Sequence, residues 1–204
     1  MLNIAVFCSG NGTNLQAIID AIKTKKLKGV RISLVVCDNP EAYALKRAGK
    51  AKIKTLLIER KDFLLKSQFE KEIIRSLKKE KVQLIVLAGF MRIIGSDLLK
   101  SYKNRIINIH PALLPSFKGA QGIKDAFDYG VKITGVTVHF VDEKMDHGPI
   151  IAQEVVVVEK KDTLKSLEDK IHKVEHRLYY QAISLFALGR IKISGRKTKL
   201  KIKY

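Results

Sequence analysis

The sequence predicts an α/β protein with a single doubly wound, mostly parallel sheet and an antiparallel hairpin in its second half. Short, almost wholly apolar runs alternate with helical patterns through the first half. Such runs are typical of parallel strands that helices cover on both faces. Two longer runs follow in the second half with only a turn between them, which favours an antiparallel pair. An amphipathic helical pattern comes after them.

The elements are expected in a simple order. Strands are predicted at residues 3–8, 31–37, 52–58 and 83–88, with helices at 15–23, 40–48 and 66–78 between them, and a short fifth strand at 105–109. Two strands at 134–142 and 149–159 form the hairpin, and the long helix begins at Asp162 or Thr163 as N-cap and ends at Gly189. Residues 191–193 are predicted to turn through Ser194 and Gly195 into a C-terminal strand.

Composition excludes several classes of protein. Hydrophobic residues make up 46% of the 204 residues, which argues against disorder. No apolar run approaches the ~20 residues of a membrane span, and the N-terminus lacks the basic start of a signal peptide. Cys8 and Cys37 both end apolar runs, so we expect small buried side chains and no disulfide. These features predict a cytoplasmic protein without membrane contact.

The formal net charge of +19 requires an explanation. Lysines are spread along the chain, but residues 190–203 carry seven basic residues and no acid. Their alternation with apolar residues is typical of an edge strand protected against aggregation. A basic surface also attracts phosphorylated or polycarboxylate small molecules. A nucleic-acid-binding module is the alternative of a different class. It would need aromatic stacking surfaces or a helix-turn-helix, and we do not expect nucleic acid as a partner.

A glycine loop, Ser9-Gly10-Asn11-Gly12-Thr13-Asn14, lies between the first strand and the first helix. Glycines permit close backbone approach, and a helix N-terminus offers N–H groups to an anion. The loop is neither a Walker A motif nor a full G-x-G-x-x-G, because Leu15 takes the place of the third glycine. It predicts a phosphate site; the simpler alternative is a turn in which Thr13 or Asn14 caps the helix. Asp38 is read as a turn former, or else as the ribose-binding acid of a dinucleotide fold.

A carboxamide and an imidazole stand on alternate residues of the fifth strand, Asn108 and His110, and therefore point to one face. Asp146 follows in the turn of the predicted hairpin. Singly, such residues are common at strand ends and turns. Together they can polarise a carbonyl, stabilise an oxyanion and move a proton. No Ser or Cys nucleophile accompanies them, so the attacking group is expected to come from a substrate.

Four segments occur in order over roughly residues 3–190: 9–16, 87–93, 108–115 and 139–151. Together they resemble the folate-dependent phosphoribosylglycinamide formyltransferase family. The resemblance implies a Rossmann-like formyltransferase fold and transfer of a formyl group from 10-formyltetrahydrofolate to the amine of 5-phosphoribosylglycinamide, in de novo purine biosynthesis. It implies no metal.

The resemblance also implies roles for particular residues. Its catalytic asparagine, histidine and aspartate fall on Asn108, His110 and Asp146. Asn108 would donate to the formyl oxygen, and His110, kept protonated by Asp146, would donate a second hydrogen bond and help move the amine proton to folate. The residues implied to bind the phosphorylated substrate are Gly12, Thr13, Asn14 and Glu175. Those implied to bind folate are Lys66, where some members have arginine, with Met91, Arg92, Ile93, Ile94 and Asn108.

We therefore expect one formyltransferase domain over residues 1–204. Its phosphate-binding half is expected at 1–100, its catalytic and folate-binding half at 101–190, and a basic C-terminal strand or tail at 191–204. A helical H-x-x-E-H pattern at residues 172–176 resembles a zinc motif. No downstream acid completes it, so we expect no metal there.

Two other formyl-group chemistries stay open. Formyltetrahydrofolate hydrolase is resembled through residues 117–120, but it usually carries an extra N-terminal domain and a second His after the catalytic one. Here the first strand begins at residue 3 and Pro111 follows His110. Another folate-dependent N-formyltransferase would use the same three residues, although the tRNA enzyme normally has an added C-terminal domain. A homodimer is also left open.

Overall fold

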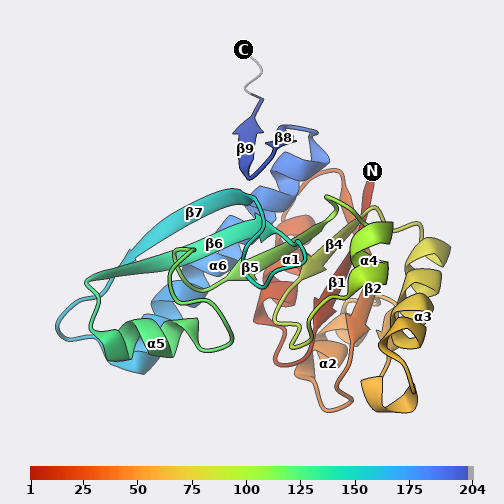
Figure 1. The fold of residues 1–204 in the computed structure, drawn as a ribbon, viewed down its shortest axis with the longest axis horizontal. Coiled ribbons are helices and arrows are strands. Elements are labelled where there is room, and N and C mark those ends of the chain that lie inside the picture. Colours follow the sequence, from red (N-terminus) through yellow and green to blue (C-terminus); the bar gives the residue numbers. More distant parts are fainter. Residues whose placement is uncertain (202–204) are drawn as a thin grey trace. The chain divides into compact units, whose positions relative to one another are not determined.

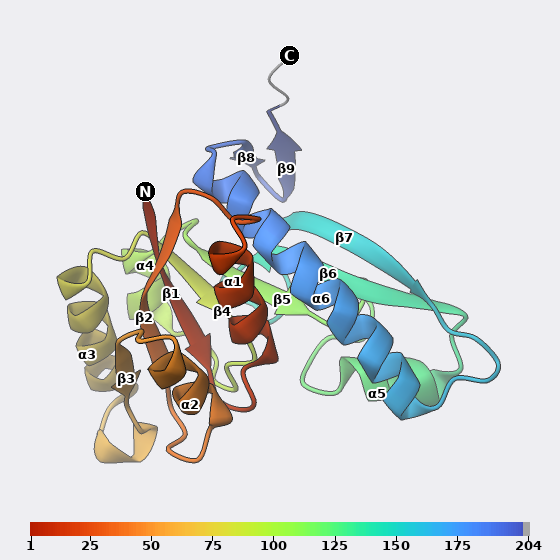
Figure 2. The same cartoon turned by 180° about the vertical axis from the view of Figure 1, so that it is seen from behind.

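Parallel strands alternate with helices in the first half of the chain. A computed structural model describes residues 1–201 (Figures 1 and 2). The strands are β1 (Leu2–Cys8), β2 (Val30–Cys37), β3 (Thr55–Leu57) and β4 (Leu84–Leu87). The helices are α1 (Thr13–Lys23), α2 (Tyr43–Lys50), α3 (Lys66–Lys79) and α4 (Ser96–Ser101), with a 3-10 turn η1 (Arg60–Asp62). The pairs β1–β2, β1–β4 and β2–β3 are all parallel.

Burial explains why these strands are so apolar. Residues 4–8 of β1 and 84–87 of β4 are all buried, and β1 is paired on both edges, which places it inside the sheet. The third strand is shorter than the 52–58 predicted, since only Thr55–Leu57 pair with β2. Lys52 takes a positive φ of 56° just after α2, and that turn delays the strand.

The second helix begins at Tyr43 and not at residue 40 as predicted. Asn39 explains the delay, since its side-chain oxygen accepts a hydrogen bond from Glu41 N at 3.0 Å. This local turn competes with helix formation. The short helix α4 was not predicted.

The second half contains β5 (Ile106–His110), α5 (Gly122–Tyr129), β6 (Ile133–Phe140), β7 (Ile150–Val157), α6 (Leu164–Ala187), β8 (Ile191–Ser194) and β9 (Lys197–Leu200). The pair β6–β7 is antiparallel, as predicted. Thr163 is the N-cap of α6, with its hydroxyl accepting from Ser166 N at 3.2 Å. The hairpin β8–β9 is a separate two-stranded sheet. Residues 202–204 of the expected C-terminal strand lie outside the described residues.

Seven strands form one sheet in the order β3-β2-β1-β4-β5-β6-β7. The predicted fold class, a mostly parallel sheet with an antiparallel hairpin in the second half, is confirmed. By its internal contacts the chain divides into two compact units, Met1–Ile107 and Asn108–Tyr204. Within residues 1–201, no helix is long and apolar enough to cross a membrane.

Candidate active site

The end of β5 presents Asn108 and His110 as alternate residues of one strand, so both side chains lie on the same face. His110 is only 4% exposed. Its Nε2 lies 2.7 Å from the carbonyl oxygen of Phe117. Because a carbonyl can only accept, Nε2 carries the hydrogen. The other ring nitrogen, Nδ1, lies 3.6 Å from Asp146 Oδ2.

A loop after β5 packs closely on this imidazole. A Cβ atom on Gly122 would lie 2.9 Å from the Phe117 carbonyl oxygen and 3.2 Å from His110 Nε2. Glycine is therefore required for the loop to approach, and the loop in turn holds His110 in one tautomer.

Asp146 lies in the turn between β6 and β7, and its carboxylate faces two imidazoles. Its side chain is 9% exposed, and Oδ2 accepts a hydrogen bond from Gly119 N at 2.9 Å. Oδ1 lies 3.7 Å from Nε2 of His139. The backbone of Asp146 has a φ of 49°, a left-handed conformation that Asp tolerates better than most residues. The structure thus brings Asp146 to His110, as predicted.

His139 is a member of this cluster that sequence reasoning did not assign. It is buried on β6, and its Nδ1 donates to the Phe140 carbonyl at 2.8 Å. Burial lowers the pKa of His139, against an opposing effect of the nearby Asp146 carboxylate. The neutral ring leaves Nε2 as an acceptor, 3.2 Å from Asn108 Nδ2. His139 therefore fixes which end of the Asn108 carboxamide is the donor. The only sequence signal was its place at the start of the fourth family segment.

The glycine loop meets α1 at Gly12, which is the N-cap residue with a φ of 73°. The alternative that Thr13 or Asn14 caps the helix is wrong, because both are inside its first turn. A Cβ on Gly12 would lie 2.7 Å from Ala44 Cβ, so only glycine fits. Arg47, not predicted, holds the loop through Asn11: its Nε donates to the Asn11 carbonyl at 2.8 Å, and Nη2 to Asn11 Oδ1 at 2.9 Å.

The segment predicted to bind the pterin follows β4 in the first unit. Met91 and Ile93 are 68% and 70% exposed, whereas Ile94 is buried. The Arg92 side chain is 39% exposed, and its Nε lies 2.5 Å from Asp38 Oδ2. Lys66 lies near the end of this segment, since a Cβ on Gly95 would come within 2.8 Å of Lys66 Cε.

Glu175 is buried on α6, at 5% exposure, and is not the solvated helix charge that its sequence position also allows. Its Oε2 accepts from His172 Nδ1 at 2.9 Å, and this hydrogen bond raises the pKa of His172. Among residues 1–201, no group of three or more His, Cys, Asp or Glu side chains has the arrangement to hold a metal ion.

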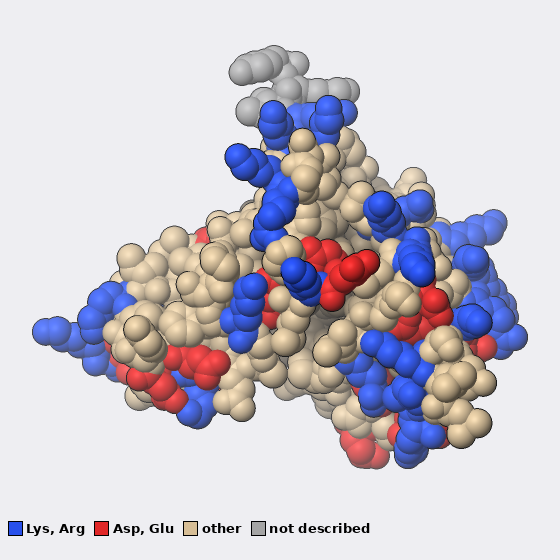
Figure 3. Space-filling model, in the orientation of Figure 1, with Lys and Arg blue, Asp and Glu red and all other residues tan. Residues whose placement is uncertain are grey.

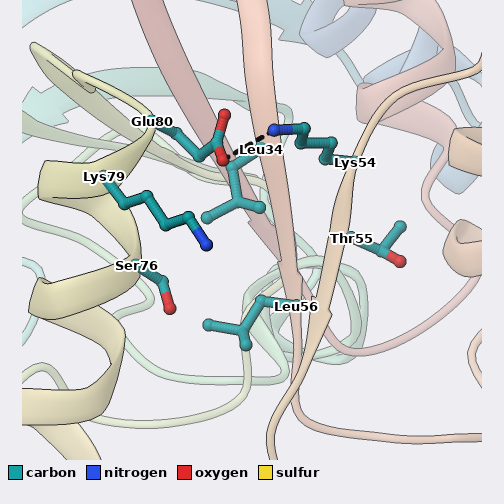
Figure 4. Close-up of a pocket in the computed structure, with 7 residues that line it drawn as sticks. All are labelled: Leu34, Lys54, Thr55, Leu56, Ser76, Lys79 and Glu80. Carbon is teal, nitrogen blue, oxygen red and sulfur yellow. Dashed lines mark hydrogen bonds and ion pairs between the residues drawn. The ribbon is translucent and has the colours of Figure 1, made fainter.

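A separate hollow in the first unit lies between β3 and the end of α3 (Figure 4). Leu34, Lys54, Thr55, Leu56, Ser76, Lys79 and Glu80 line it. Lys54 Nζ and Glu80 Oε1 form an ion pair across it at 2.9 Å. The hollow contains none of the residues predicted to bind substrates.

Comparison with known proteins shows the family of the chain. The profile of the formyl transferase family matches residues 2–183. The chain is 46% identical over 183 residues to phosphoribosylglycinamide formyltransferase of Bacillus subtilis (strain 168), across 90% of this chain and 93% of the relative. Glycinamide ribonucleotide transformylase 1 from Symbiobacterium toebii has a TM-score of 0.95 at 40% identity, across 98% of this chain and 94% of that one. A formyltetrahydrofolate deformylase from Pseudomonas syringae pv. tomato has a TM-score of 0.88 at 25% identity, with 98% and 65% covered.

The chain therefore belongs to the formyl transferase family. Within that family, its similarity is to the phosphoribosylglycinamide formyltransferases, and the resemblance stated from the sequence is confirmed.

Proposed function

We propose that this chain transfers the formyl group of 10-formyltetrahydrofolate to the amine of 5-phosphoribosylglycinamide, a step of de novo purine biosynthesis, and that Asn108, His110 and Asp146 carry out the transfer. The observation that supports it most is the cluster itself. A fixed amide donor, a tautomer-fixed imidazole and a buried carboxylate meet at the end of β5. These are the groups that acyl transfer to an amine requires.

Asn108 stabilises the oxyanion in this proposal. The amine nitrogen bonds to the formyl carbon, and the formyl oxygen becomes negatively charged in the tetrahedral intermediate. One hydrogen of Asn108 Nδ2 is held by His139, so the second is oriented for that oxygen. A preorganised donor stabilises the transition state more strongly, because it does not have to reorganise as the negative charge develops.

His110 and Asp146 move the proton. Nε2–H is committed to the Phe117 carbonyl. In this proposal the His110 ring starts neutral, unlike the protonated ring that the resemblance implies, and Nδ1 takes the proton that the attacking amine loses. The Asp146 carboxylate, 3.6 Å away, stabilises the imidazolium that forms. His110 then delivers the proton to the folate nitrogen as its bond to the formyl carbon breaks. The products are the formylated amide and tetrahydrofolate.

The remaining assignments place the substrates. Gly12, Thr13 and Asn14 offer backbone N–H groups at the start of α1 to the ribose phosphate, where the helix dipole favours an anion. Glu175 accepts from the ribose hydroxyls. For folate, we propose backbone and apolar contacts from Met91, Arg92, Ile93 and Ile94, with Lys66 near the folate carboxylates and Asn108 at the formyl group.

We also propose that the protein acts in the cytoplasm, where its two free, buried cysteines would stay reduced. The homodimer left open above stays a prediction, which light scattering would check.

The test follows formyl-folate consumption by absorbance, with phosphoribosylglycinamide present or omitted. We expect consumption only when it is present; equal loss without it would instead identify a hydrolase. Asn108→Ala, His110→Ala and Asp146→Asn should each lower kcat by about 10²–10³ while the fold, checked by circular dichroism, is retained. Asp128→Asn is the matched control, because that carboxylate is exposed and pairs with Lys124 in the same helix. Wild-type kcat in the His110 variant would contradict the mechanism.

A further inference from the structure

Asp38, directly after β2, is a buried acid to which the proposed mechanism gives no role. Its side chain is 6% exposed, and both carboxylate oxygens are used. Ser9 Oγ donates to Oδ1 at 2.5 Å, and Arg92 Nε lies 2.5 Å from Oδ2. In the bend after β2, Asn39 accepts from Glu41 N, whereas the Asp38 carboxylate faces Ser9 and Arg92. A buried carboxylate is retained only when such partners compensate its lost hydration.

The partners of Asp38 come from two different loops. Ser9 is the first residue of the glycine loop. Arg92 belongs to the segment after β4, here called the pterin segment (residues 89–94). Ser9 is also bonded to that segment directly: its N donates to the Gly89 carbonyl at 2.9 Å, and its Oγ accepts from Met91 N at 2.9 Å. Asp38 and Ser9 thus join the two loops through one hydrogen-bond network.

The far end of the pterin segment is held differently. Glu70 of α3 accepts from Gly95 N at 2.6 Å and from Leu98 N at 3.1 Å. This anchor joins α3 to the start of α4. The position of Met91 and Arg92 therefore depends on Ser9 and Asp38, and the position of residue 95 depends on Glu70.

We propose that Asp38 is a positioning residue that couples phosphate binding at the glycine loop to folate binding at the pterin segment, so that each substrate raises the affinity for the other. This inference rests on the proposed function of both loops. Asp38 accepts from Ser9 and Arg92 together only when both loops are in place. A phosphate that orders the glycine loop therefore lowers the ordering cost that folate meets, and the coupling is reciprocal.

The test is calorimetric titration with 5-formyltetrahydrofolate, a folate that serves here as the binding probe, with and without saturating ribose 5-phosphate. In the wild type we expect ribose 5-phosphate to lower the folate Kd about fivefold or more, the usual range for such coupling. In Asp38→Asn the ratio of the two Kd values should fall to about one. Glu41→Gln is the matched control, since it removes an exposed carboxylate three positions away and should keep the wild-type ratio.

A second variant tests the same network. Ser9→Ala removes the hydroxyl that joins Asp38 to Met91 and should also abolish the coupling. The double variant Ser9→Ala/Asp38→Asn should show no further loss of coupling, because the effects of residues in one network are not additive. If Asp38→Asn does not fold, the ratio of folate Kd values in Ser9→Ala alone tests the inference. A merely structural Asp38 would lower the melting temperature and weaken both ligands while keeping the ratio. That result, or a wild-type ratio of one, overturns the inference. A wild type that binds neither probe and transfers no formyl group contradicts the proposed function instead.

Discussion

His139 is held in one tautomer by the backbone carbonyl of the next residue, Phe140, and this has consequences for Asn108. The Phe140 carbonyl takes the Nδ1 hydrogen, so Nε2 can only accept, and Asn108 Nδ2 is the donor that it meets. The Asn108 oxygen therefore points away from His139. Were His139 protonated, two donors would face each other and the amide would turn. The state of one buried imidazole thus decides whether the proposed oxyanion donor is correctly oriented.

The first prediction concerns His139 and pH. Because burial lowers its pKa in the folded state, the neutral ring is favoured by folding. The stability that neutral His139 contributes is fully present above its pKa in the unfolded chain, about 6.5. It is lost as the pH falls through the lower pKa of His139 in the folded protein. In His139→Gln, the decline in unfolding free energy between about pH 7 and pH 5 should be shallower, as measured by urea titration. An unchanged slope would show that His139 does not titrate in this range.

Substitutions of His139 should also change kcat, because His139 orients Asn108. His139→Leu retains an apolar side chain but offers Asn108 no acceptor. We expect kcat to fall by about 10–100-fold, the range for residues that orient an active group, while both Michaelis constants change less. His139→Gln, whose amide oxygen can accept, should recover part of kcat. A wild-type kcat in His139→Leu would remove His139 from the mechanism.

At the scale of elements, the β8–β9 hairpin contacts the turn that carries Asp146. Thr198 Oγ1 donates to the Ile150 carbonyl at 2.6 Å, and the Arg196 guanidinium contacts the ring of His147. His147 Nδ1 in turn donates to Asp142 Oδ2 at 2.8 Å. The hairpin thus braces the β6–β7 turn beside Asp146, whose left-handed backbone needs such support.

We predict that Arg196→Ala lowers kcat by a factor of roughly 2–30, the range for residues that modulate a site without touching its ligands. The expected cause is a looser β6–β7 turn and a poorly placed Asp146, so the Michaelis constants should change little. Arg190→Ala is the control, because its carbonyl, which accepts from Lys201 N, is retained. Steady-state kinetics on both variants are the measurement. Equal kcat values would limit the hairpin to a structural role.

The glycine loop is the second element whose geometry makes a prediction. In Gly12→Ala, the added Cβ meets Ala44 at 2.7 Å and the left-handed backbone costs about 1–2 kcal/mol. The loop must therefore move. The Michaelis constant for the phosphorylated substrate should rise by a larger factor than that for formyl-folate. Gly10→Ala is the matched control, since nothing lies within 4 Å of its Cβ position. Equal effects on both constants would contradict the phosphate assignment.

At the scale of the whole molecule, the nucleic-acid alternative considered from composition depends on how the net charge of +19 is distributed. On the face drawn in Figure 3, Lys and Arg side chains are interspersed with acidic ones. The large exposed aromatic residues within residues 1–201 are Tyr43 and Tyr129. Arg47 covers the Tyr43 ring at 4.9 Å, and Tyr129 packs edge-on against Phe117 at 6.0 Å. Both rings have protein partners, so neither is a ready stacking surface for bases.

Most of the strands could be predicted because their apolar runs are local facts of the chain. The runs at β1 and β2 and the long stripe of α6 are each readable in a window of ten to twenty residues. The helices α4 (Ser96–Ser101) and α5 (Gly122–Tyr129) were missed, because a helix of only about two turns carries little periodic signal. The glycine loop could be located from the sequence, but its N-cap residue could not, since glycine at position 12 is required by the contact with Ala44 and not by its neighbours in sequence.

By itself, the sequence determined the fold class, the family and the positions of Asn108, His110 and Asp146, since these depend on local patterns and on motifs read in order. Only the tertiary structure decided which side chains hold Asn108 and the glycine loop in place. His139, Asp38 and Arg47 act across 31, 29 and 36 positions of chain, and no local pattern records a hydrogen bond over such distances. The physical reason is that burial and hydrogen-bond geometry belong to the packed chain, whereas side-chain chemistry belongs to the residue.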